Sequence, residues 1–145
     1  MTLCVFIQKE WINLVKNIEV NSKATGIGKI IGNKGGVMIT FRIFETSFCF
    51  LSCHLAAHPS HELQRRENYH DLIKFLRSGL KNLEPTFQFD YIFWLGDMNF
   101  RINGPFDLVV EMVNNHELVK LQEFCQLKKA RNNNFIFSDF EVFIF

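Results

Sequence analysis

The chain has 145 residues, of which 48% are hydrophobic and 21% are charged, a balance that is typical of one folded globular domain. Its formal net charge is +1, which excludes the strongly basic character of most nucleic-acid-binding domains. Phenylalanine is enriched, with 17 residues against 2 tryptophans and 2 tyrosines, so a core has to bury many aromatic rings.

Hydrophobic periodicity and turn-forming residues predict strands that alternate with helices. In chain order, the predicted elements are a strand over 3–8, a short helix or irregular edge over 11–18, a glycine-rich loop over 25–36, strands over 37–44 and 48–53, a helix over 61–80, a strand over 90–95, helices over 105–113 and 117–125, and a strand-like tail over 135–145. The apolar run over 48–53 predicts a central strand covered on both faces. Leu63 and Leu72 belong to the apolar stripe of the first long helix. This interleaving favours a mixed α/β (α+β) layered domain.

The cysteine usage and the start of the chain bear on the compartment. Four cysteines are present without a Cys-x-x-Cys pair, and nothing in their spacing indicates a metal site or a secreted disulfide scaffold. Cys49 and Cys53 lie in an apolar run and are predicted to be core residues. The first residues lack a basic stretch, and their apolar run is too short for a signal peptide or a membrane span. A reducing, cytoplasmic location is therefore expected.

Two of the predicted strands end in polar residues that suit phosphate chemistry. Asp97 and Asn99 follow the strand over 90–95, and His54 follows the strand over 48–53. At such strand ends a carboxylate can orient or deprotonate a water, while an amide or an imidazole can donate to a phosphate oxygen. In an extended segment Asp97 and Asn99 would point to the same side. Each pattern alone also fits a structural role, since Gly, Asp and Asn favour turns.

The glycine-rich loop is a third candidate site. It carries Lys29 and Lys34 among five glycines, so exposed backbone N–H groups and two cations would cradle an anion. The Gly-Lys-Ser/Thr ending of a P-loop is absent. By itself the segment can equally be interpreted as a flexible hairpin.

The order of these patterns resembles the inositol polyphosphate 5-phosphatases. The matching segments are Thr25-Gly26, Gly32-Asn33-Lys34-Gly35-Gly36-Val37, Cys53-His54-Leu55-Ala56-Ala57-His58, Gln64-Arg65-Arg66-Glu67-Asn68-Tyr69 and Phe93-Trp94-Leu95-Gly96-Asp97-Met98-Asn99-Phe100-Arg101-Ile102. The last of these is highly specific to the family. Met98, Phe100 and the Gln-Arg-x-Glu-Asn sequence from Gln64 are most similar to the skeletal-muscle-and-kidney-enriched and proline-rich subgroups, and His-Leu-Ala-Ala-His from His54 is also found in the Lowe-syndrome-protein-like subgroup. Family members tend to have Asp-Gln-Leu where this chain has Cys125-Gln126-Leu127.

The resemblance implies a DNase-I-like β-sandwich flanked by helices. It also implies Mg²⁺-dependent removal of the 5-phosphate from phosphoinositides (phosphatidylinositol 4,5-bisphosphate or 3,4,5-trisphosphate) or from soluble inositol polyphosphates, by in-line attack of water. By position, the resemblance implies that Asp97 activates the water and that Asn99 and His54 contact the scissile phosphate. It implies that Asn33 and Lys34 contact the headgroup near its 1-phosphate and the membrane surface. Supporting roles are implied for Arg101, which would hold the motif loop, for Arg65, which would form an ion pair in the helix, and for His58. Peripheral association with cytoplasmic membranes follows.

The resemblance places other parts of the family's site outside this sequence. The family's metal-binding Glu would lie upstream of residue 1, and its 4-phosphate-binding and closing Ser-Asp-His segments would lie beyond residue 145. Residues 1–145 are then an internal, incomplete portion of the catalytic domain, without its N-terminal strands and its C-terminal third, and are expected to have little or no activity alone. Two alternatives stay open: a non-catalytic phosphoinositide-binding remnant that uses Lys29 and Lys34, and a nuclease of the same fold.

Overall fold

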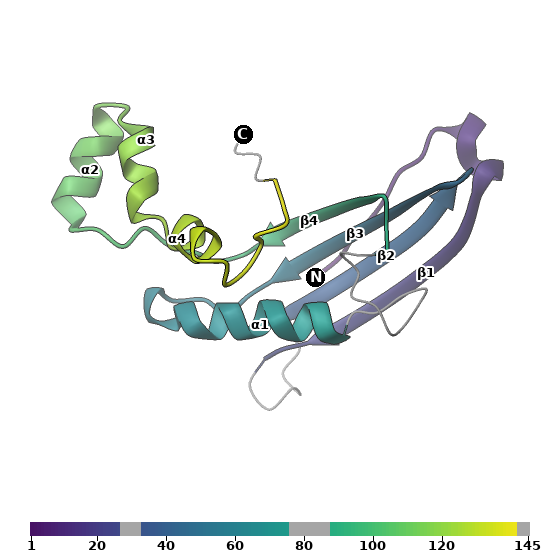
Figure 1. Cartoon of the computed structure of the whole chain (residues 1–145), viewed down its shortest axis with the longest axis horizontal. Helices are drawn as coiled ribbons and strands as arrows, with labels where there is room; N and C mark the ends of the chain where they lie inside the picture. Colours follow the sequence, from purple (N-terminus) through teal and green to yellow (C-terminus); the bar gives the residue numbers. More distant parts are fainter. Residues whose placement is uncertain (27–32, 76–87, 142–145) are drawn as a thin grey trace.

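A computed structural model describes residues 1–26, 33–75 and 88–141, and these residues form one four-stranded sheet with helices against it (Figure 1). The strand order is β1-β2-β3-β4. The β1–β2 and β2–β3 pairs are antiparallel, whereas β3 and β4 are parallel. The strand bounds are Val15–Ala24 for β1, Gly35–Ile43 for β2, Thr46–His54 for β3 and Tyr91–Asp97 for β4.

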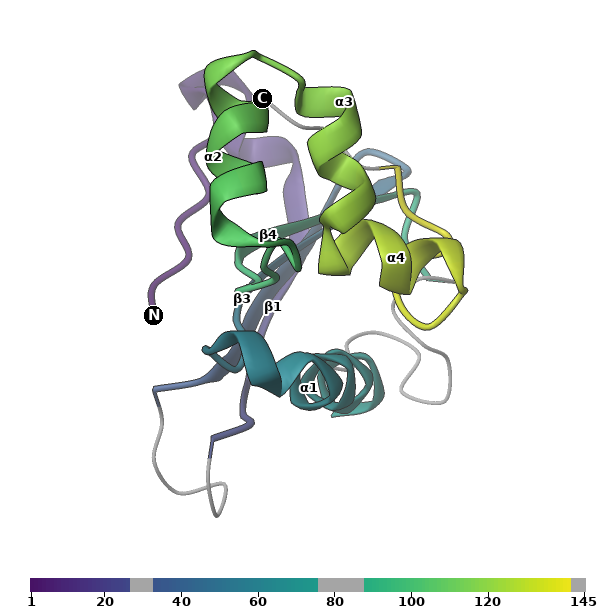
Figure 2. The same ribbon diagram turned by 90° about the vertical axis from the view of Figure 1, so that its left-hand side faces the viewer.

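The helices occupy two places relative to the sheet. Figures 1 and 2 show α1 running along one face, while α2, α3 and α4 gather at the end toward which β3 and β4 point. The bounds are Lys9–Leu14 for the 3-10 helix η1, Pro59–His61 for the 3-10 helix η3, Glu62–Phe75 for α1, Phe106–Asn114 for α2, Leu118–Leu121 for α3, Gln122–Phe124 for the 3-10 helix η5 and Gln126–Asn132 for α4. The predicted α/β class is confirmed by this arrangement.

The core lies between α1 and the face of the sheet toward it. Alternate residues of β2 and β3 point there, and Met38, Cys49, Leu51 and Cys53 are at most 1% exposed together with Leu72 of α1. Burial raises the pKa of Cys49 to about 12 and that of Cys53 to about 11, so both thiols stay neutral. Their predicted place in the core is confirmed.

A second cluster of apolar residues joins α1 to α4 and the segment after it. Tyr69 of α1 stacks near Trp94 of β4 with ring centroids 5.0 Å apart, and Phe137 lies 4.4 Å from Tyr69. Ala130 of α4 and Ile136 complete this cluster. This cluster holds α1 and α4 near the carboxyl ends of β3 and β4, where the candidate site lies.

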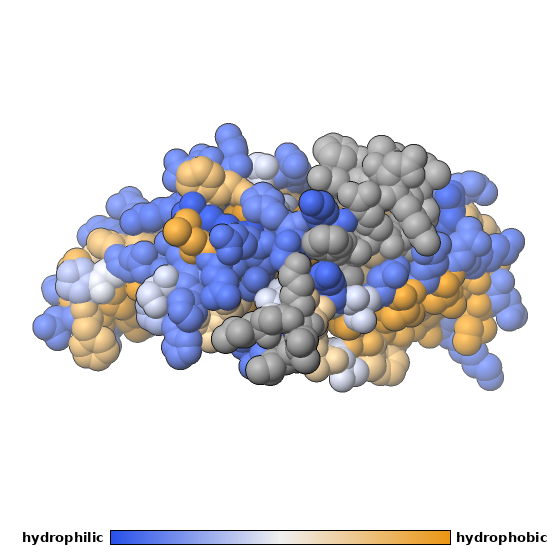
Figure 3. All heavy atoms as spheres, turned by 90° about the horizontal axis from the view of Figure 1, so that it is seen from below, coloured by the Kyte–Doolittle hydropathy of each residue, from blue (hydrophilic) through white to orange (hydrophobic). Residues whose placement is uncertain are grey.

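The opposite face of the sheet carries a row of aromatic rings, here called the aromatic ladder. Neighbouring rings stack at 4.9–5.8 Å along this face. Its members are Phe41, Phe48, Phe50, Tyr91 and Phe93. Tyr91 and Phe93 of β4 are 55% and 46% exposed, whereas Phe48 and Phe50 of β3 are half-buried, so within the described residues the strand predicted over 48–53 is covered fully on one face and partly on the other. In Figure 3, hydrophobic residues are exposed along one edge of the part of the molecule that the strands form.

Two predicted strands near the chain ends are wrong, whereas the short helix or irregular edge predicted over 11–18 is confirmed in part. Residues 3–8 form no strand, and the segment over 11–18 divides between η1 and the edge strand β1. The tail over 135–141 is not a strand, because Asn134 and Phe137 have positive φ angles that break an extended run. Residues 142–145, at the end of the predicted tail, lie outside the described residues.

The predicted helices were partly right. The helix over 61–80 corresponds to η3 and α1, and its last five residues lie outside the described residues. Leu63 is 69% exposed, so its predicted place in the apolar stripe is wrong. The helices over 105–113 and 117–125 correspond to α2 and to α3 with η5, whereas α4 was not predicted.

Candidate functional site

The polar residues at the ends of β3 and β4 lie side by side. His54 and Asp97 are paired across the two parallel strands, and His54 Nε2 is 3.5 Å from Asp97 Oδ2. Their side chains are 36% and 62% exposed, so a ligand can reach both. Parallel strands deliver their last residues to the same edge of a sheet. The structure therefore brings these two candidate residues together.

Lys34 completes a cluster of three charged or titratable groups. Its Nζ lies 2.6 Å from His54 Nε2, because the first residue of β2, Gly35, is paired with His54. An ammonium group only donates, so His54 Nε2 accepts and the ring proton is assigned to Nδ1. A cation, an imidazole and a carboxylate thus meet at one point, here called the Lys34–His54–Asp97 cluster. Asn33 is exposed at the turn before β2, and Lys29 lies outside the described residues.

Asn99 is held by the loop that follows β4. Its φ angle is +56°, and its backbone N–H donates to Asp97 Oδ1 at 3.0 Å. The extended geometry predicted for residues 97–99 is therefore wrong, because the Asp97 carboxylate closes a turn. The Asn99 side chain donates from Nδ2 to the carbonyl of Leu55 at 3.1 Å. An amide group carries two N–H donors, so one remains for a ligand.

Gly96 allows the end of β4 to approach β3. Its φ angle is +113°, a conformation that side chains rarely adopt. A Cβ atom there would lie 2.2 Å from the carbonyl oxygen of Cys53. The glycine of the Gly-Asp-Met-Asn segment is thus required to set Asp97 beside His54.

Arg101 ties the Asn99 loop together from the other side. Its Nε donates to the carbonyl of Asn99 at 3.1 Å, and its Nη2 donates to Asn99 Oδ1 at 2.6 Å. These contacts fit the supporting role that the resemblance implied for Arg101. They also leave the guanidinium directed at the loop.

Arg65 and His58 belong to the loop that follows His54. Arg65 is fully buried and donates to the carbonyls of Ala56 and His58 at 3.0 and 2.7 Å. Its predicted ion pair is wrong among the described residues, because the carboxylate one turn away, Glu62, pairs with Arg66 instead. His58 supports the loop through its carbonyl, and its exposed ring packs edge-on against His61 at 5.4 Å.

Two residues near the site were not singled out from the sequence. Asn68 of α1 accepts the backbone N–H of Ala56 at 3.1 Å, and Gln126 at the start of α4 is 1% exposed and contacts both site loops. Asn68 stands in a segment that matches the inositol polyphosphate 5-phosphatases, whereas Gln126 stands in Cys125-Gln126-Leu127, where family members tend to have Asp-Gln-Leu. Placing Gln126 near the site required α4, an element that the hydrophobic pattern did not indicate.

The described residues do not make up a complete metal site. Within residues 1–26, 33–75 and 88–141, no group of three or more His, Cys, Asp or Glu side chains is placed to hold a metal ion. Asp97 and His54 are only two such groups, and His54 Nε2 already accepts from Lys34. A metal would need further ligands beyond those the described residues supply.

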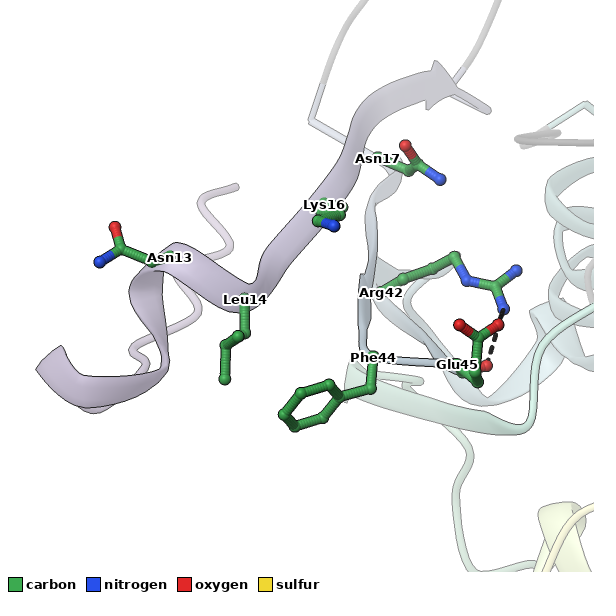
Figure 4. Close-up of a pocket in the computed structure, with 7 residues that line it drawn as sticks. All are labelled: Asn13, Leu14, Lys16, Asn17, Arg42, Phe44 and Glu45. Atoms are coloured by element: carbon green, nitrogen blue, oxygen red, sulfur yellow. Dashed lines mark hydrogen bonds and ion pairs between the residues drawn. The ribbon is translucent and has the colours of Figure 1, made fainter.

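A separate hollow of about 340 Å³ lies at the other end of β2 and β3 (Figure 4). It is lined by residues from the junction of η1 and β1 and from the β2–β3 turn, among them Lys16, Arg42 and Phe44. Arg42 is directed at the turn, where it donates to the carbonyl of Glu45 at 2.7 Å. The strands separate this hollow from the Lys34–His54–Asp97 cluster.

The described residues form a mixed α/β protein with a lysine, a histidine and an aspartate gathered at its strand ends. Residues 1–142 match the sequence profile of the Endonuclease/Exonuclease/phosphatase family 2, and the chain belongs to this family. The match covers every candidate residue named above.

The chain is similar to several named phosphatases. It is 36% identical to Synaptojanin-2 of Rattus norvegicus over 95% of this chain and 9% of that protein. It is also 36% identical to Polyphosphatidylinositol phosphatase INP53 of Saccharomyces cerevisiae, over 97% of this chain and 13% of that protein. For Phosphatidylinositol 3,4,5-trisphosphate 5-phosphatase 1 of Xenopus laevis the identity is 32%, over 95% of this chain and 14% of that protein. The chain thus spans about a tenth of the length of these relatives.

A solved structure shares the fold of the chain. The inositol polyphosphate 5-phosphatase domain of a synaptojanin, in complex with inositol (1,4)-bisphosphate and a calcium ion, superposes with a TM-score of 0.79 at 32% identity. The match covers 89% of this chain and 37% of that one. A Cimex nitrophorin at 20% identity and a TM-score of 0.62 shares the fold alone.

Proposed function

We propose that the chain supplies the phosphate-facing part of a site that removes the 5-phosphate from phosphoinositides, phosphatidylinositol 4,5-bisphosphate or 3,4,5-trisphosphate, or from soluble inositol polyphosphates. The observation that carries this proposal is the Lys34–His54–Asp97 cluster. Three different segments contribute one group each, and the groups meet at an exposed strand end. The names of the similar proteins support the same reaction class.

Asp97, Lys34 and Asn99 have distinct tasks in this proposal, and His54 accepts from Lys34 Nζ through its Nε2 and so holds the ammonium group at the site. Asp97 is the most exposed of them and orients, or takes a proton from, the attacking water. The Lys34 ammonium and the free N–H of Asn99 stabilise the negative charge that builds on the phosphate oxygens. Because Lys34 Nζ contacts His54, we assign Lys34 to the scissile phosphate and not to the 1-phosphate.

The cofactor and the location are part of the proposal. We propose Mg²⁺ as the metal, held chiefly by a glutamate upstream of residue 1, where it would offset charge on the phosphate. The substrate would be met at a cytoplasmic membrane surface, with the chain bound peripherally. Among the described residues, no helix is long and apolar enough to cross a membrane. We propose that residues 1–145 are an internal portion of the catalytic domain, without its N-terminal strands and its C-terminal third.

Phosphate release from phosphatidylinositol 4,5-bisphosphate with Mg²⁺ tests the activity of the chain. Little or no release is expected, since the described residues do not complete a metal site. Turnover like that of an intact 5-phosphatase would overturn this expectation.

Binding tests the cluster separately. Inositol (1,4,5)-trisphosphate, which carries the scissile 5-phosphate, should bind when titrated into the chain, and Lys34→Ala should weaken binding by about tenfold, because one charged hydrogen bond to that phosphate is lost. Lys16→Ala is the matched control, since Lys16 lies at the opposite end of the sheet. Equal effects of the two substitutions would contradict the proposed cluster.

A non-catalytic phosphoinositide-binding role is the second candidate. It is favoured by the combination of an accessible cation–imidazole pair and an incomplete metal site among the described residues. Vesicle binding that Lys34→Ala abolishes, with no turnover in the longer protein either, would establish it. The nuclease alternative is disfavoured by the net charge of +1, and degradation of duplex DNA by the chain would revive it.

A further inference from the structure

Two loops carry the candidate site. Hydrogen bonds join them directly close to the ends of the strands. One follows β3 and runs from Leu55 to Pro59, and the other follows β4 and runs from Met98 to Asn103. Near the strands, the Leu55 N–H donates to the Asp97 carbonyl at 3.0 Å, and Asn99 Nδ2 donates to the Leu55 carbonyl. Farther out, a side chain from another element hydrogen-bonds to both loops.

That side chain is Gln126, the first residue of α4. Its Nε2 donates to the Pro59 carbonyl at 3.1 Å in one loop and to Asn103 Oδ1 at 2.7 Å in the other. Its Oε1 accepts from the Arg101 N–H at 3.0 Å and from Arg65 Nη2 at 2.5 Å. An amide has two donors and two lone pairs, so all of its hydrogen-bonding capacity is used within the protein.

Arg65 is the second part of this contact. Its guanidinium is fully buried and donates to three carbonyls of the first loop, those of Ala56, His58 and Pro59, as well as to Gln126. Burial lowers the pKa of Arg65, since removing its charge from water is costly. A charge held by neutral carbonyls fixes the path of the loop more than it stabilises the fold.

Arg101 links Gln126 to Asn99, the proposed phosphate-binding residue. Gln126 holds the Arg101 backbone from both directions, because its own N–H also donates to the Arg101 carbonyl at 3.0 Å. The Arg101 side chain in turn holds the carbonyl and Oδ1 of Asn99. A change at Gln126 is therefore transmitted to Asn99 through one intervening residue.

We infer that Gln126, with Arg65, is a positioning residue that fixes the two site loops relative to each other and thereby sets the place of Asn99 beside the Lys34–His54–Asp97 cluster. Gln126 does not touch the proposed ligand. The inference rests on the proposed function only in treating Asn99 as a phosphate-binding residue. The geometric link itself is a property of the fold.

Nuclear magnetic resonance on the full chain tests the inference through the Asn99 side-chain amide and the His54 ring signals. Gln126→Glu keeps the acceptor that faces Arg65 and Arg101, but it turns the donor toward Pro59 and Asn103 into an acceptor. The expected result is a shift of the Asn99 amide signals and a loss of affinity for inositol (1,4,5)-trisphosphate, which carries the 5-phosphate, of about tenfold. Gln122→Ala is the matched control, since that amide accepts from Lys128 Nζ and contacts neither loop.

The outcomes separate the inference from the proposed function. A lower melting temperature with unchanged Asn99 signals would overturn the inference and leave Gln126 a structural residue only. If the unmodified chain does not bind the trisphosphate, the proposed function fails, while the Asn99 signals still decide the positioning. If Gln126→Glu does not fold, Asn103→Ala removes one bond of Gln126 and must still shift the Asn99 signals. No shift in that variant would also overturn the inference.

Discussion

At the scale of single residues, the site depends on backbone conformations that only a few residue types adopt. Gly96 and Asn99 both have positive φ angles, and they flank the Asp97 carboxylate. Asparagine tolerates the left-handed region, but the close approach at Gly96 leaves no room for any side chain. The backbone conformations of Gly96 and Asn99 therefore set the geometry of Asp97.

Gly96→Ala should lower the free energy of unfolding by about 2–4 kcal/mol, because the added Cβ meets the Cys53 carbonyl in a strained backbone. Denaturant unfolding measures this loss. Gly104→Ala is the control, since its Cβ would meet the side-chain atoms of Val109 and Phe124, which can move. A loss at Gly96 no larger than that at Gly104 would contradict the described approach of the strands.

Asp90 stabilises the start of β4 in a pH-dependent way. The Ser47 hydroxyl and backbone N–H both donate to its carboxylate, at 2.6 and 2.8 Å, and they lower the pKa of Asp90. A carboxyl whose pKa is lower in the folded state stabilises the fold above its unfolded-state pKa of about 4, and this contribution is lost as pH falls through the folded-state value. Asp90→Asn should therefore flatten the fall in unfolding free energy below about pH 4. A pH series of unfolding curves that is identical for both proteins would refute this.

At the scale of elements, α1 supports the site by packing its buried side on β2 and β3. Leu72 is fully buried in this contact, whereas Leu63, on the first turn of the same helix, is 69% exposed. The hydrophobic pattern alone treated the two leucines alike. Only the position of η3 and the loop before it decides which side of the first turn faces water.

Leu72→Ala should cost about 2–5 kcal/mol of unfolding free energy, since it leaves a cavity beneath the sheet. Leu63→Ala is the matched control in the same helix and should cost less than about 1 kcal/mol. Thermal or denaturant unfolding of both variants gives the comparison. Similar losses would show that the packing of α1 differs from that described.

At the scale of the whole molecule, the sheet has one covered and one open face. Strands over 3–8 and 135–145, which the sequence predicted, would have left unpaired edges near both ends of the chain, and such edges favour aggregation. The structure shows no strand over 3–8 or 135–141, and the apolar surface is the aromatic ladder instead. Large exposed apolar patches favour association between molecules.

The isolated chain should therefore self-associate as its concentration rises. Light scattering coupled to size-exclusion chromatography should report a mass that falls toward that of a monomer in Phe93→Ser. Phe6→Ser is the control, because Phe6 is 93% exposed but lies outside the ladder. A monomer at all concentrations, or equal effects of the two substitutions, would contradict the role of the ladder.

The local pattern was sufficient for the central strands, for α2 and for the pair of His54 and Asp97, because strand periodicity and the order of motifs are encoded by neighbouring residues. The contact of Lys34 with His54, the turn at Asn99 and the function of Gln126 depended on tertiary structure. Gln126 lies 61 residues from Arg65 and 67 from Pro59 along the chain, and no local pattern encodes such contacts. The motifs therefore indicated which chemistry to expect, whereas packing between α1, α4 and the strand ends decided where each group stands.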